Sequence, residues 1–241
     1  MSNQRAANIV VLTGAGISAE SGLKTFRGDG GIWEGERIED VCTPEAFARD
    51  PVRVNRFYNE RRSQLLKSAK PNPAHMALAD FERRHSGQLT LITQNVDNLH
   101  EQAGSSHVMH MHGELLKARC LSTLTILPWQ DDITVDTPCP CCHQVGRLRP
   151  HIVWFGEIPF YMFDIDDALA SCDVFIAVGT SGTVYPAAGF VEQAASHGAH
   201  TIEVNLEATS ARFDEHIEGL ASVELPKLLN RLAEPFAQAM Q

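Results

Sequence analysis

Residues 8 to 33 read NIVVLTGAGISAESGLKTFRGDGGIW, and this stretch decides the fold. Its apolar start, Ile9 to Leu12, is long enough for one buried strand. Two glycines then break the strand, and a helix can open behind them. Gly14, Gly16 and Ala19 fit G-x-G-x-x-G/A, a turn that brings backbone N–H groups and a helix N-terminus to a pyrophosphate. The acidic residue that usually follows some ~20 positions later is not evident.

Length and charge limit the class of protein. The 241 residues can form one α/β domain, or a large domain with a small insert. Twenty basic against thirty acidic residues give a net charge of −10, which weighs against a nucleic-acid or anionic-membrane surface. No apolar run approaches the ~20 residues of a membrane span, and the first residues are too polar for a signal peptide. With six cysteines and no sign of secretion, we expect a cytoplasmic protein.

Strands and helices alternate along the chain, which predicts an α/β fold with a doubly wound parallel sheet. Asp50-Pro51 and Asn72-Pro73 each place a capping residue before a proline, a typical helix start. The further predicted buried strands are Leu89 to Thr93, Asp173 to Gly179 and Thr201 to Val204, and the further predicted helices are Ala187 to His197 and Pro226 to Gln241.

Polar segments follow three of these strands, namely Gln94 to Asn98, Thr180 to Gly182 and Asn205 to Glu207. Open α/β sheets bind ligands at the carboxyl ends of their strands, so these segments are candidates for a ligand crevice. For the first of them, a turn rich in helix-capping residues remains the alternative.

The segment Val108 to His112 reads VMHMH, and its alternation places His110 and His112 on one face of a strand. A histidine pair can bind a metal, but the spacing alone is weak evidence. One structural and one functional histidine is the reading we favour.

The helix behind Asp50 carries an apolar stripe of Val54, Phe57, Tyr58 and Leu65. Arg61 stands where this stripe requires an apolar residue. In one alternative, the Arg61 side chain extends past the edge of the stripe and its charge reaches solvent. In the other, the guanidinium points into the fold. No acidic residue shares the stripe, so a substrate carboxylate would then be its partner.

A cysteine-containing segment interrupts the α/β pattern between about Leu116 and Arg149. Cys139 and Cys142 have the spacing of a zinc knuckle, but Thr123 stands where Cys120 would need its partner. We predict a structural metal bound by Cys120, Cys139 and Cys142, with Cys141, His143 or water as the fourth ligand. The alternative is a small domain that has lost its metal.

Eight motifs in order resemble the sirtuin family: GAGIS (14–18), TFR (25–27), QNVD (94–97), HG (112–113), the cysteine insert, VWFGE (153–157), GTS (179–181) and NLE (205–207). The resemblance covers about residues 8 to 225. It implies an NAD-dependent protein lysine deacylase with a Rossmann-like domain, a small zinc domain and a peptide bound between them. The large domain would comprise about 1–34, 71–115 and 150–241, and the small domain two insertions, a helical one at about 35–70 and the cysteine-containing one at 116–149.

The resemblance also implies site residues. His112 would be the general base, and Val153 and Trp154 would pair with the substrate peptide as a strand. Phe26 would be a lid over the cofactor. The residues implied to bind NAD are Gly14, Ala15, Gly16, Ile17, Ser18, Glu20, Thr25, Phe26, Arg27, Trp33, Gln94, Asn95, Val96, Asp97, Gly179, Thr180, Ser181, Asn205, Leu206, Glu207 and Ala221.

The implied reaction consumes NAD as an electrophile. The acyl-lysine carbonyl oxygen attacks the anomeric carbon of the nicotinamide ribose, and nicotinamide leaves. His112, with an ordinary pKa of about 6.5, is suited to take a proton from a ribose hydroxyl at neutral pH. The products would be free lysine and O-acyl-ADP-ribose.

Tyr58-x-x-Arg61 is similar to the branch of the family that removes acidic acyl groups, so we expect succinyl and malonyl as well as acetyl substrates. Three positions depart from the family pattern. Thr25 stands where most sirtuins carry Asp, Thr123 replaces a zinc cysteine, and Cys42 stands where this branch commonly has Ala and would narrow the acyl pocket slightly.

Other functions remain open from the sequence: a mono-ADP-ribosyltransferase, an NAD-linked oxidoreductase, and a non-catalytic NAD-sensing or zinc-ribbon module. As partners we expect acyl-lysine proteins, no nucleic acid and no membrane, and we expect a monomer.

Overall fold

The computed structural model describes residues 6–24, 32–33 and 35–233, with only the backbone described at 32–33. The predicted α/β fold is confirmed, because its centre is a parallel sheet with the strand order β11-β10-β9-β1-β4-β5. The strands are β1 (Ile9–Thr13), β4 (Leu89–Thr93), β5 (Val108–His110), β9 (Val174–Val178), β10 (His200–Asn205) and β11 (Glu215–Glu218).

The strand order reverses between β1 and β9. From β1 the chain proceeds outward to β4 and β5, and after β9 it proceeds in the other direction to β10 and β11. Such a switch point leaves a crevice at the carboxyl ends of the two central strands, where open α/β sheets bind their ligands.

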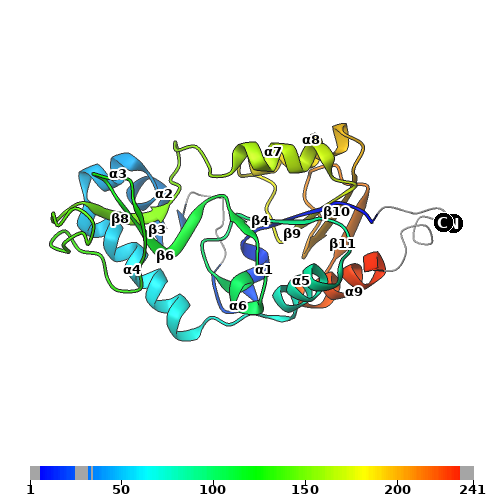
Figure 1. The fold of residues 1–241 in the computed structure, drawn as a ribbon, viewed down its shortest axis with the longest axis horizontal. Helices are drawn as coiled ribbons and strands as arrows, with labels where there is room; N and C mark the ends of the chain where they lie inside the picture. Colours follow the sequence, from blue (N-terminus) through cyan, green and yellow to red (C-terminus); the bar gives the residue numbers. More distant parts are fainter. Residues whose placement is uncertain (1–5, 25–31, 34, 234–241) are drawn as a thin grey trace.

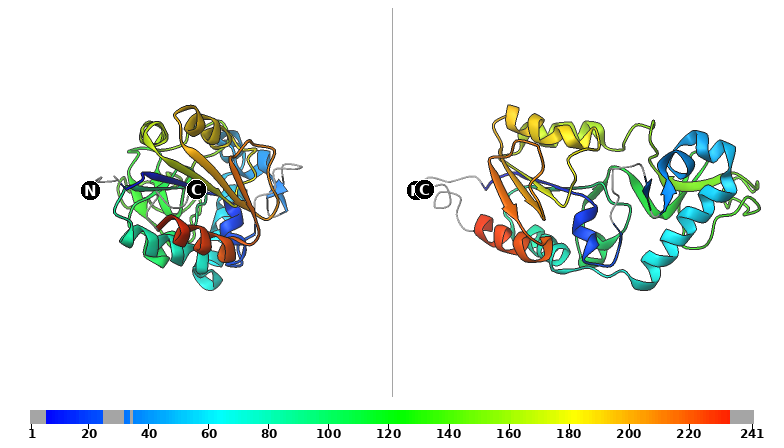
Figure 2. Two further views of the ribbon diagram at one scale, coloured as in Figure 1. Left: turned by 90° about the vertical axis from the view of Figure 1, so that its right-hand side faces the viewer. Right: turned by 180° about the vertical axis from the view of Figure 1, so that it is seen from behind.

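Helices cover both faces of the sheet (Figures 1 and 2). Residues of β1 alternate between two cores: Ile9 and Val11 pack under the helices of one face, Val10 and Leu12 under those of the other. The helices on the first face are α1 (Ala15–Ala19), α5 (Pro73–Arg84), α6 (Leu99–Ala103) and α9 (Ala221–Ala233), and those on the second are α7 (Met162–Ser171) and α8 (Phe190–Ser196), with the short 3-10 turn η1 (Ala187–Gly189) leading into α8.

Both predicted capped helix starts are confirmed. Asp50 Oδ1 accepts from Arg53 N at 2.9 Å, and Asn72 Oδ1 accepts from Ala74 N at 2.9 Å. The predicted start of the last helix at Pro226 is wrong, because α9 begins at Ala221 and holds the proline inside it. The remainder of that predicted helix, from residue 234 onward, lies outside the described residues.

A second group of elements lies beside the large sheet (Figure 1, left). We call it the small lobe. It contains an antiparallel sheet with the order β7-β6-β8 and the long helix α4. Its elements are β2 (Ile32–Trp33), β3 (Glu36–Arg37), α2 (Ile38–Val41), α3 (Pro44–Arg49), α4 (Pro51–Ser68), β6 (Gly113–Cys120), β7 (Ile126–Pro128) and β8 (Leu148–Ile152).

The stripe predicted on α4 packs inward in the small lobe, with Val54, Phe57, Tyr58 and Leu65 all buried. Sequence reasoning missed its neighbour Arg62, which is 1% exposed. Arg62 Nε donates to the carbonyl of Leu115 in β6 at 2.8 Å, and its Nη1 donates to Asn59 Oδ1 at 2.8 Å and to Asp131 O at 3.1 Å. Burial lowers its pKa to about 10, yet it remains a cation that holds α4 to β6 and to the loop around Asp131.

Among the helices of the described residues, none has both the length and the apolar character needed to cross a bilayer.

Candidate active site

The glycine turn after β1 lies directly against the turn after β9. Gly14 N donates to Val178 O at 2.9 Å and Gly16 N donates to Gly179 O at 2.8 Å. A Cβ on Gly14 or Gly16 would lie 2.7 Å from backbone atoms of Gly179, and Gly179 itself has a φ of +60°. A side chain at any of these three glycines would therefore push the turns apart.

A buried hydrogen-bond network joins this turn to the segment after β4. Asn95 Nδ2 donates to Gly14 O at 2.9 Å and to Ser18 Oγ at 3.1 Å, and Ser18 Oγ donates to Asp97 Oδ2 at 3.0 Å. The Leu99 N–H donates to the other Asp97 oxygen at 3.1 Å. Burial raises the pKa of Asp97, while the donors from Leu99 and Ser18 oppose that shift. The network fixes the turn and the segment relative to each other.

Two further contacts join predicted cofactor segments at the same edge of the sheet. Asn205 Nδ2 donates to Thr180 O at 2.8 Å. Glu20 accepts from the N–H of Ser222 at 3.0 Å, next to Ala221 at the start of α9. The structure thus brings together four segments that are far apart in the sequence. Leu206, 64% exposed, points to solvent.

Some predicted positions lie outside the described residues. This applies to Thr25, Phe26 and Arg27, and to the side chain of Trp33, whose backbone belongs to β2.

His112 follows β5, which ends at His110 rather than running on to His112 as predicted. The His112 Nδ1 lies 3.1 Å from Gln94 O. A carbonyl only accepts, so Nδ1 carries the proton and Nε2 is the basic nitrogen. Burial lowers the pKa of His112, while the contact with Gln94 raises it. The imidazole is therefore neutral at neutral pH, as a general base requires.

His110 differs from His112 although both rings contact the same segment. Its Nδ1 lies 3.2 Å from Asn95 O and its Nε2 lies 2.7 Å from Glu101 Oε1. Burial alone would lower the pKa of His110, but the Glu101 carboxylate outweighs it and the pKa is raised. With both nitrogens engaged, His110 is a structural residue. Among the described residues, neither histidine belongs to a group that could hold a metal.

One buried amide beside His112 has no partner among the described residues: Gln94 Nε2 is enclosed and donates no hydrogen bond. Gln94 N donates to Thr13 O at 2.9 Å, which places this side chain at the end of β1. An unpartnered buried donor costs free energy, so an acceptor on a bound ligand would stabilise it.

The segment after β8 connects the two lobes next to His112. Val153 N donates to His112 O at 2.9 Å, Trp154 N to Glu157 Oε2 at 2.8 Å, and Phe155 N to Cys42 O at 2.9 Å. All three N–H groups are used within the protein. Glu157 is in turn held by Arg149, whose Nη1 donates to Glu157 Oε1 at 2.7 Å.

Behind this segment lies a cluster of Trp154, Tyr58 and Cys42. Trp154 Nε1 donates to Tyr58 Oη at 3.0 Å, and Cys42 Sγ lies 3.0 Å from the same oxygen. Burial raises the pKa of the Cys42 thiol to about 11 and raises that of Tyr58 well above its ordinary value. Both groups therefore stay protonated and neutral.

Arg61 lies beside this cluster, with a side chain that is 11% exposed. Its guanidinium carbon is 3.5 Å from the centroid of the Phe57 ring, and Nη1 donates to Phe57 O at 2.5 Å. One carboxylate does approach it, since Glu60 Oε2 is 3.4 Å from Nη1, although Glu60 belongs to the exposed side of α4. The charge of Arg61 is thus mostly enclosed.

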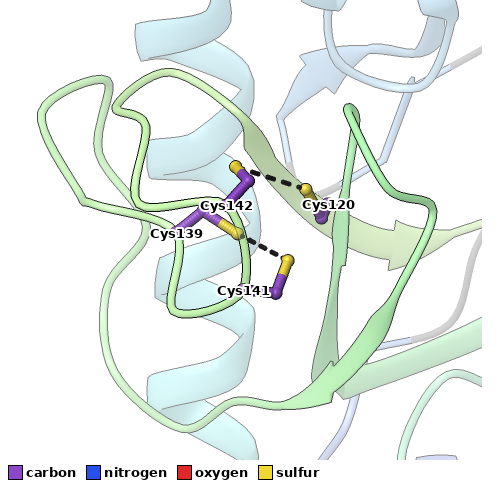
Figure 3. A group of neighbouring side chains, drawn as sticks. All are labelled: Cys120, Cys139, Cys141 and Cys142. Atoms are coloured by element: carbon purple, nitrogen blue, oxygen red, sulfur yellow. Dashed lines mark hydrogen bonds between the residues drawn. The ribbon is translucent and has the colours of Figure 1, made fainter.

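Four cysteines meet at the far end of β6 (Figure 3). The sulfurs of Cys120, Cys139, Cys141 and Cys142 all lie within 4.8 Å of one another. Sulfurs around a tetrahedral zinc with Zn–S of about 2.3 Å lie about 3.8 Å apart, so the group fits zinc. Cys141 Sγ is 3.2 Å from Thr123 Oγ1, which places its sulfur beside the residue that replaces the expected cysteine.

Sequence reasoning placed Cys141 only among several possible fourth ligands, and it missed the ion pair of the buried Arg149 with the partly buried Glu157. For Arg62, a signal was available, since it lies eight residues after Val54 and four after Tyr58, within a wider apolar stripe. No local pattern marks Arg149, because its burial depends on Glu157.

Comparisons with known proteins agree with this arrangement. The model of the Sir2 family matches residues 14–186. The chain is 58% identical over 224 residues to the NAD-dependent protein deacylase of Yersinia pseudotuberculosis, covering 92% of this chain and 81% of that one. It is 54% identical over 237 residues to the NAD-dependent protein deacylase of Vibrio cholerae, covering 97% and 96%.

Solved structures with a similar fold are also Sir2 proteins. A Sir2 homologue in complex with NAD superposes with a TM-score of 0.84 at 38% identity, covering 93% of this chain and 88% of that one. A Sir2 protein bound to an acetylated peptide superposes with a TM-score of 0.79 at 28% identity, covering 92% of each chain.

Proposed function

The chain belongs to the Sir2 family and is an NAD-dependent protein deacylase, and from that premise we propose that it removes succinyl and malonyl groups as well as acetyl groups from lysine side chains. The reaction releases nicotinamide and O-acyl-ADP-ribose. The observation that carries the acidic-acyl part is the enclosed guanidinium of Arg61 beside Tyr58.

The glycine turns after β1 and β9, together with the segments beside them, would hold NAD. The turns at Gly14 to Ser18 and Gly179 to Ser181 would bring phosphates to the N-terminus of α1. The N–H groups of Gly14, Gly16 and Gly179 are themselves donated within the protein, so these glycines would act by allowing close approach. The buried Gln94 Nε2 offers a donor to an amide or ribose oxygen. The segment at Asn205 and the start of α9 at Ala221 would enclose the adenosine side. When bound, NAD supplies an electrophilic anomeric carbon with nicotinamide as its leaving group.

His112 would be the general base. Gln94 O holds the proton on Nδ1, so Nε2 is the atom that accepts a proton from a ribose hydroxyl. Its lowered pKa keeps Nε2 available at neutral pH. Val153 N–H donates to the His112 carbonyl, which ties the base to the segment that would bind the peptide.

The segment of Val153 and Trp154 would bind the substrate main chain. Because the N–H groups of this segment are donated within the protein, it would offer carbonyl oxygens to N–H donors of a substrate strand. The Val153 carbonyl is the first candidate, since Trp154 O already accepts from Glu157 N at 2.9 Å. Recognition of this kind is tolerant of sequence.

Arg61 and Tyr58 would bind the acyl carboxylate. They lie three residues apart on α4, so their side chains project to one side of the helix. The Arg61 guanidinium can form paired hydrogen bonds to a carboxylate, and the Tyr58 hydroxyl is a second donor. A hydrogen bond to a charged group is worth about 1.5–3 kcal/mol, roughly a 10- to 150-fold preference.

The test replaces the charge with a side chain of similar length. Arg61→Met should lower the ratio of desuccinylation to deacetylation by at least about 10-fold, since only the succinyl group loses an ionic partner. The measurement is kcat/KM by mass spectrometry on matched succinyl-, malonyl- and acetyl-lysine peptides with NAD. Arg56→Met, an exposed position of the same helix, is the control. Equal losses for all acyl groups would mean that Arg61 supports α4 and does not contact the acyl chain.

Zinc would be held by Cys120, Cys139, Cys142 and Cys141 at the end of β6, remote in the fold from His112 at its beginning. It would act as a structural ion that closes the loops of the small lobe.

A further inference from the structure

The Tyr58 hydroxyl has a defined direction in this structure, because its neighbour Trp154 can only donate a hydrogen bond to it. An indole N–H has no acceptor function, so the 3.0 Å contact from Trp154 Nε1 makes Tyr58 Oη the acceptor. The Tyr58 hydrogen must then point elsewhere. Cys42 Sγ lies 3.0 Å from the same oxygen, and a phenol is a stronger donor than a thiol, so the favoured bond runs from Tyr58 to Cys42.

Trp154 is itself firmly held, so the direction of its indole N–H is set by the fold. Glu157 accepts from its backbone N–H at 2.8 Å. The guanidinium carbon of Arg149 lies 3.4 Å above the indole ring, and the ring of Phe47 packs at 5.2 Å. Trp154 is 2% exposed. Turning the indole away from Tyr58 would break the ring contacts with both Arg149 and Phe47.

Cys42 lies between Tyr58 and the segment that follows Trp154. Its carbonyl accepts from Phe155 N at 2.9 Å while its sulfur meets Tyr58. Arg61 is close enough for its charge to lower the pKa of Cys42, against the larger effect of burial that raises it. Tyr58 and Arg61 lie three residues apart on α4, so a carboxylate that reaches Arg61 arrives on the side of the helix that carries the Tyr58–Cys42 bond. Since a carboxylate is a far stronger acceptor than a neutral thiol, it would take the Tyr58 hydrogen in place of Cys42.

We propose that Trp154 and Cys42 are positioning residues that act through the Tyr58 hydroxyl and thereby set the preference of the enzyme for acidic acyl groups. Trp154 keeps the hydroxyl oriented as a donor. Cys42 accepts its hydrogen when no substrate is present and competes with the substrate carboxylate for it. The inference rests on the proposed contact of Arg61 and Tyr58 with the acyl carboxylate.

The two residues should shift selectivity in opposite directions. Cys42→Ala removes the competing acceptor, so the ratio of kcat/KM for succinyl over acetyl peptide should rise roughly 2- to 10-fold, the range of one neutral hydrogen bond. Trp154→Phe keeps an aromatic ring but removes the indole N–H, so the ratio should fall by a similar factor. Cys172→Ala, the same chemical change at a buried thiol in the core under α7 and α8, should leave the ratio unchanged.

A double-mutant cycle separates this role from a general packing effect. In a Tyr58→Phe background no hydroxyl is left to orient, so adding Cys42→Ala should no longer raise the ratio. A ratio that stays constant or falls in Cys42→Ala, or that rises equally in the Tyr58→Phe background, would overturn the inference. This result needs no Trp154 variant and stands even if Trp154→Phe folds poorly.

Arg61→Met distinguishes the failure of this inference from that of the proposed function. If Arg61→Met lowers the succinyl-to-acetyl ratio but Cys42→Ala does not change it, only the orienting role is wrong. If Arg61→Met leaves the ratio unchanged, the acidic-acyl function itself is wrong, and the inference falls with it.

Discussion

His110 and His112 are two residues apart and contact neighbouring carbonyls, yet only one of them can act as a base. His110 has hydrogen-bond partners at both ring nitrogens, one of them the carboxylate of Glu101. His112 is bonded only at Nδ1 among the described residues. The chemistry of each ring is therefore set by its second nitrogen and not by its place in the sequence.

His112→Ala should lower kcat for deacylation by about 10²- to 10⁴-fold, the usual cost of losing a general base. NAD binding and the folded state should remain close to wild type. In the wild-type enzyme, kcat should fall as the pH drops below the pKa of His112, because protonation of Nε2 removes the base. Burial lowers that pKa, so the fall should lie below about pH 6.5.

The measurement is kcat as a function of pH, with NAD affinity determined separately by calorimetry. The exposed His197→Ala serves as the control. Near-wild-type turnover in purified His112→Ala would exclude this assignment.

At the scale of elements, the sequence predicts those helices and strands whose signals lie within their own residues. The strands β1, β4, β9 and β10 are apolar runs, and the helices α4 and α5 have capping residues before a proline, so each could be predicted. The sheet of β6 and β8 could not. β8 reads LRPHI and is buried at all five positions, because Arg149 is neutralised by Glu157 and not because the strand is apolar.

The same limit applies to the candidate site. The glycine turn and the polar ends of β4, β9 and β10 are visible as patterns, and the structure brings them together. The contact of Cys42 with Tyr58 and the approach of Cys141 to Thr123 both depend on tertiary folding, so no spacing reveals them.

The four cysteines at the end of β6 allow a test in which the loss of one zinc ligand is compensated by a new cysteine nearby. Cys141→Ser should lower the zinc content of protein purified without chelators and lower its melting temperature, because a structural site requires four ligands. Adding Thr123→Cys should restore both, since Thr123 Oγ1 already lies 3.2 Å from the Cys141 sulfur. Elemental analysis and thermal unfolding check this.

His143→Ala is the control for that experiment, since His143 is the neighbouring residue that sequence reasoning left as an alternative ligand. It should leave zinc content unchanged. Full zinc occupancy in Cys141→Ser, combined with loss in His143→Ala, would reverse the assignment of the fourth ligand.

At the scale of the whole molecule, several buried histidines must stay neutral. The rings of His75 and His100 lie 4.9 Å apart and are 0% and 1% exposed. Burial lowers the pKa of His75 to about 4 and that of His100 well below 6.5. His151 in β8 is similar, with a pKa lowered to about 4 by burial and then by Arg119.

Stability should therefore depend on pH in a defined window. Above about pH 6.5 these histidines are neutral in both states and contribute no pH dependence. As the pH falls from 6.5 toward 4, the unfolded chain binds protons that the folded chain does not, so the free energy of unfolding decreases. Each such group contributes about 1.4 kcal/mol per pH unit. His110, whose pKa is raised, acts in the opposite direction.

Urea unfolding at pH 7.5, 6.5, 5.5 and 4.5 would test this. His75→Gln should make the free energy of unfolding depend less on pH between pH 6.5 and 4.5. The same change at the exposed His107, His107→Gln, should leave that dependence unchanged. A free energy of unfolding that stays constant down to pH 4.5 would mean that these rings are protonated in the folded state.

The close contact between the glycine turns after β1 and β9 affects how sequence variation in this protein should be interpreted. Gly14 and Gly16 each lie against the backbone of Gly179, so a side chain at any of the three would clash whether or not NAD is bound. A saturation library selected only for soluble expression should return glycine at all three positions, just as one selected for activity would. Invariance at these sites among related sequences would therefore be equally well explained by folding. Positions such as Gln94, whose buried amide lacks a protein partner among the described residues, are more informative about the ligand.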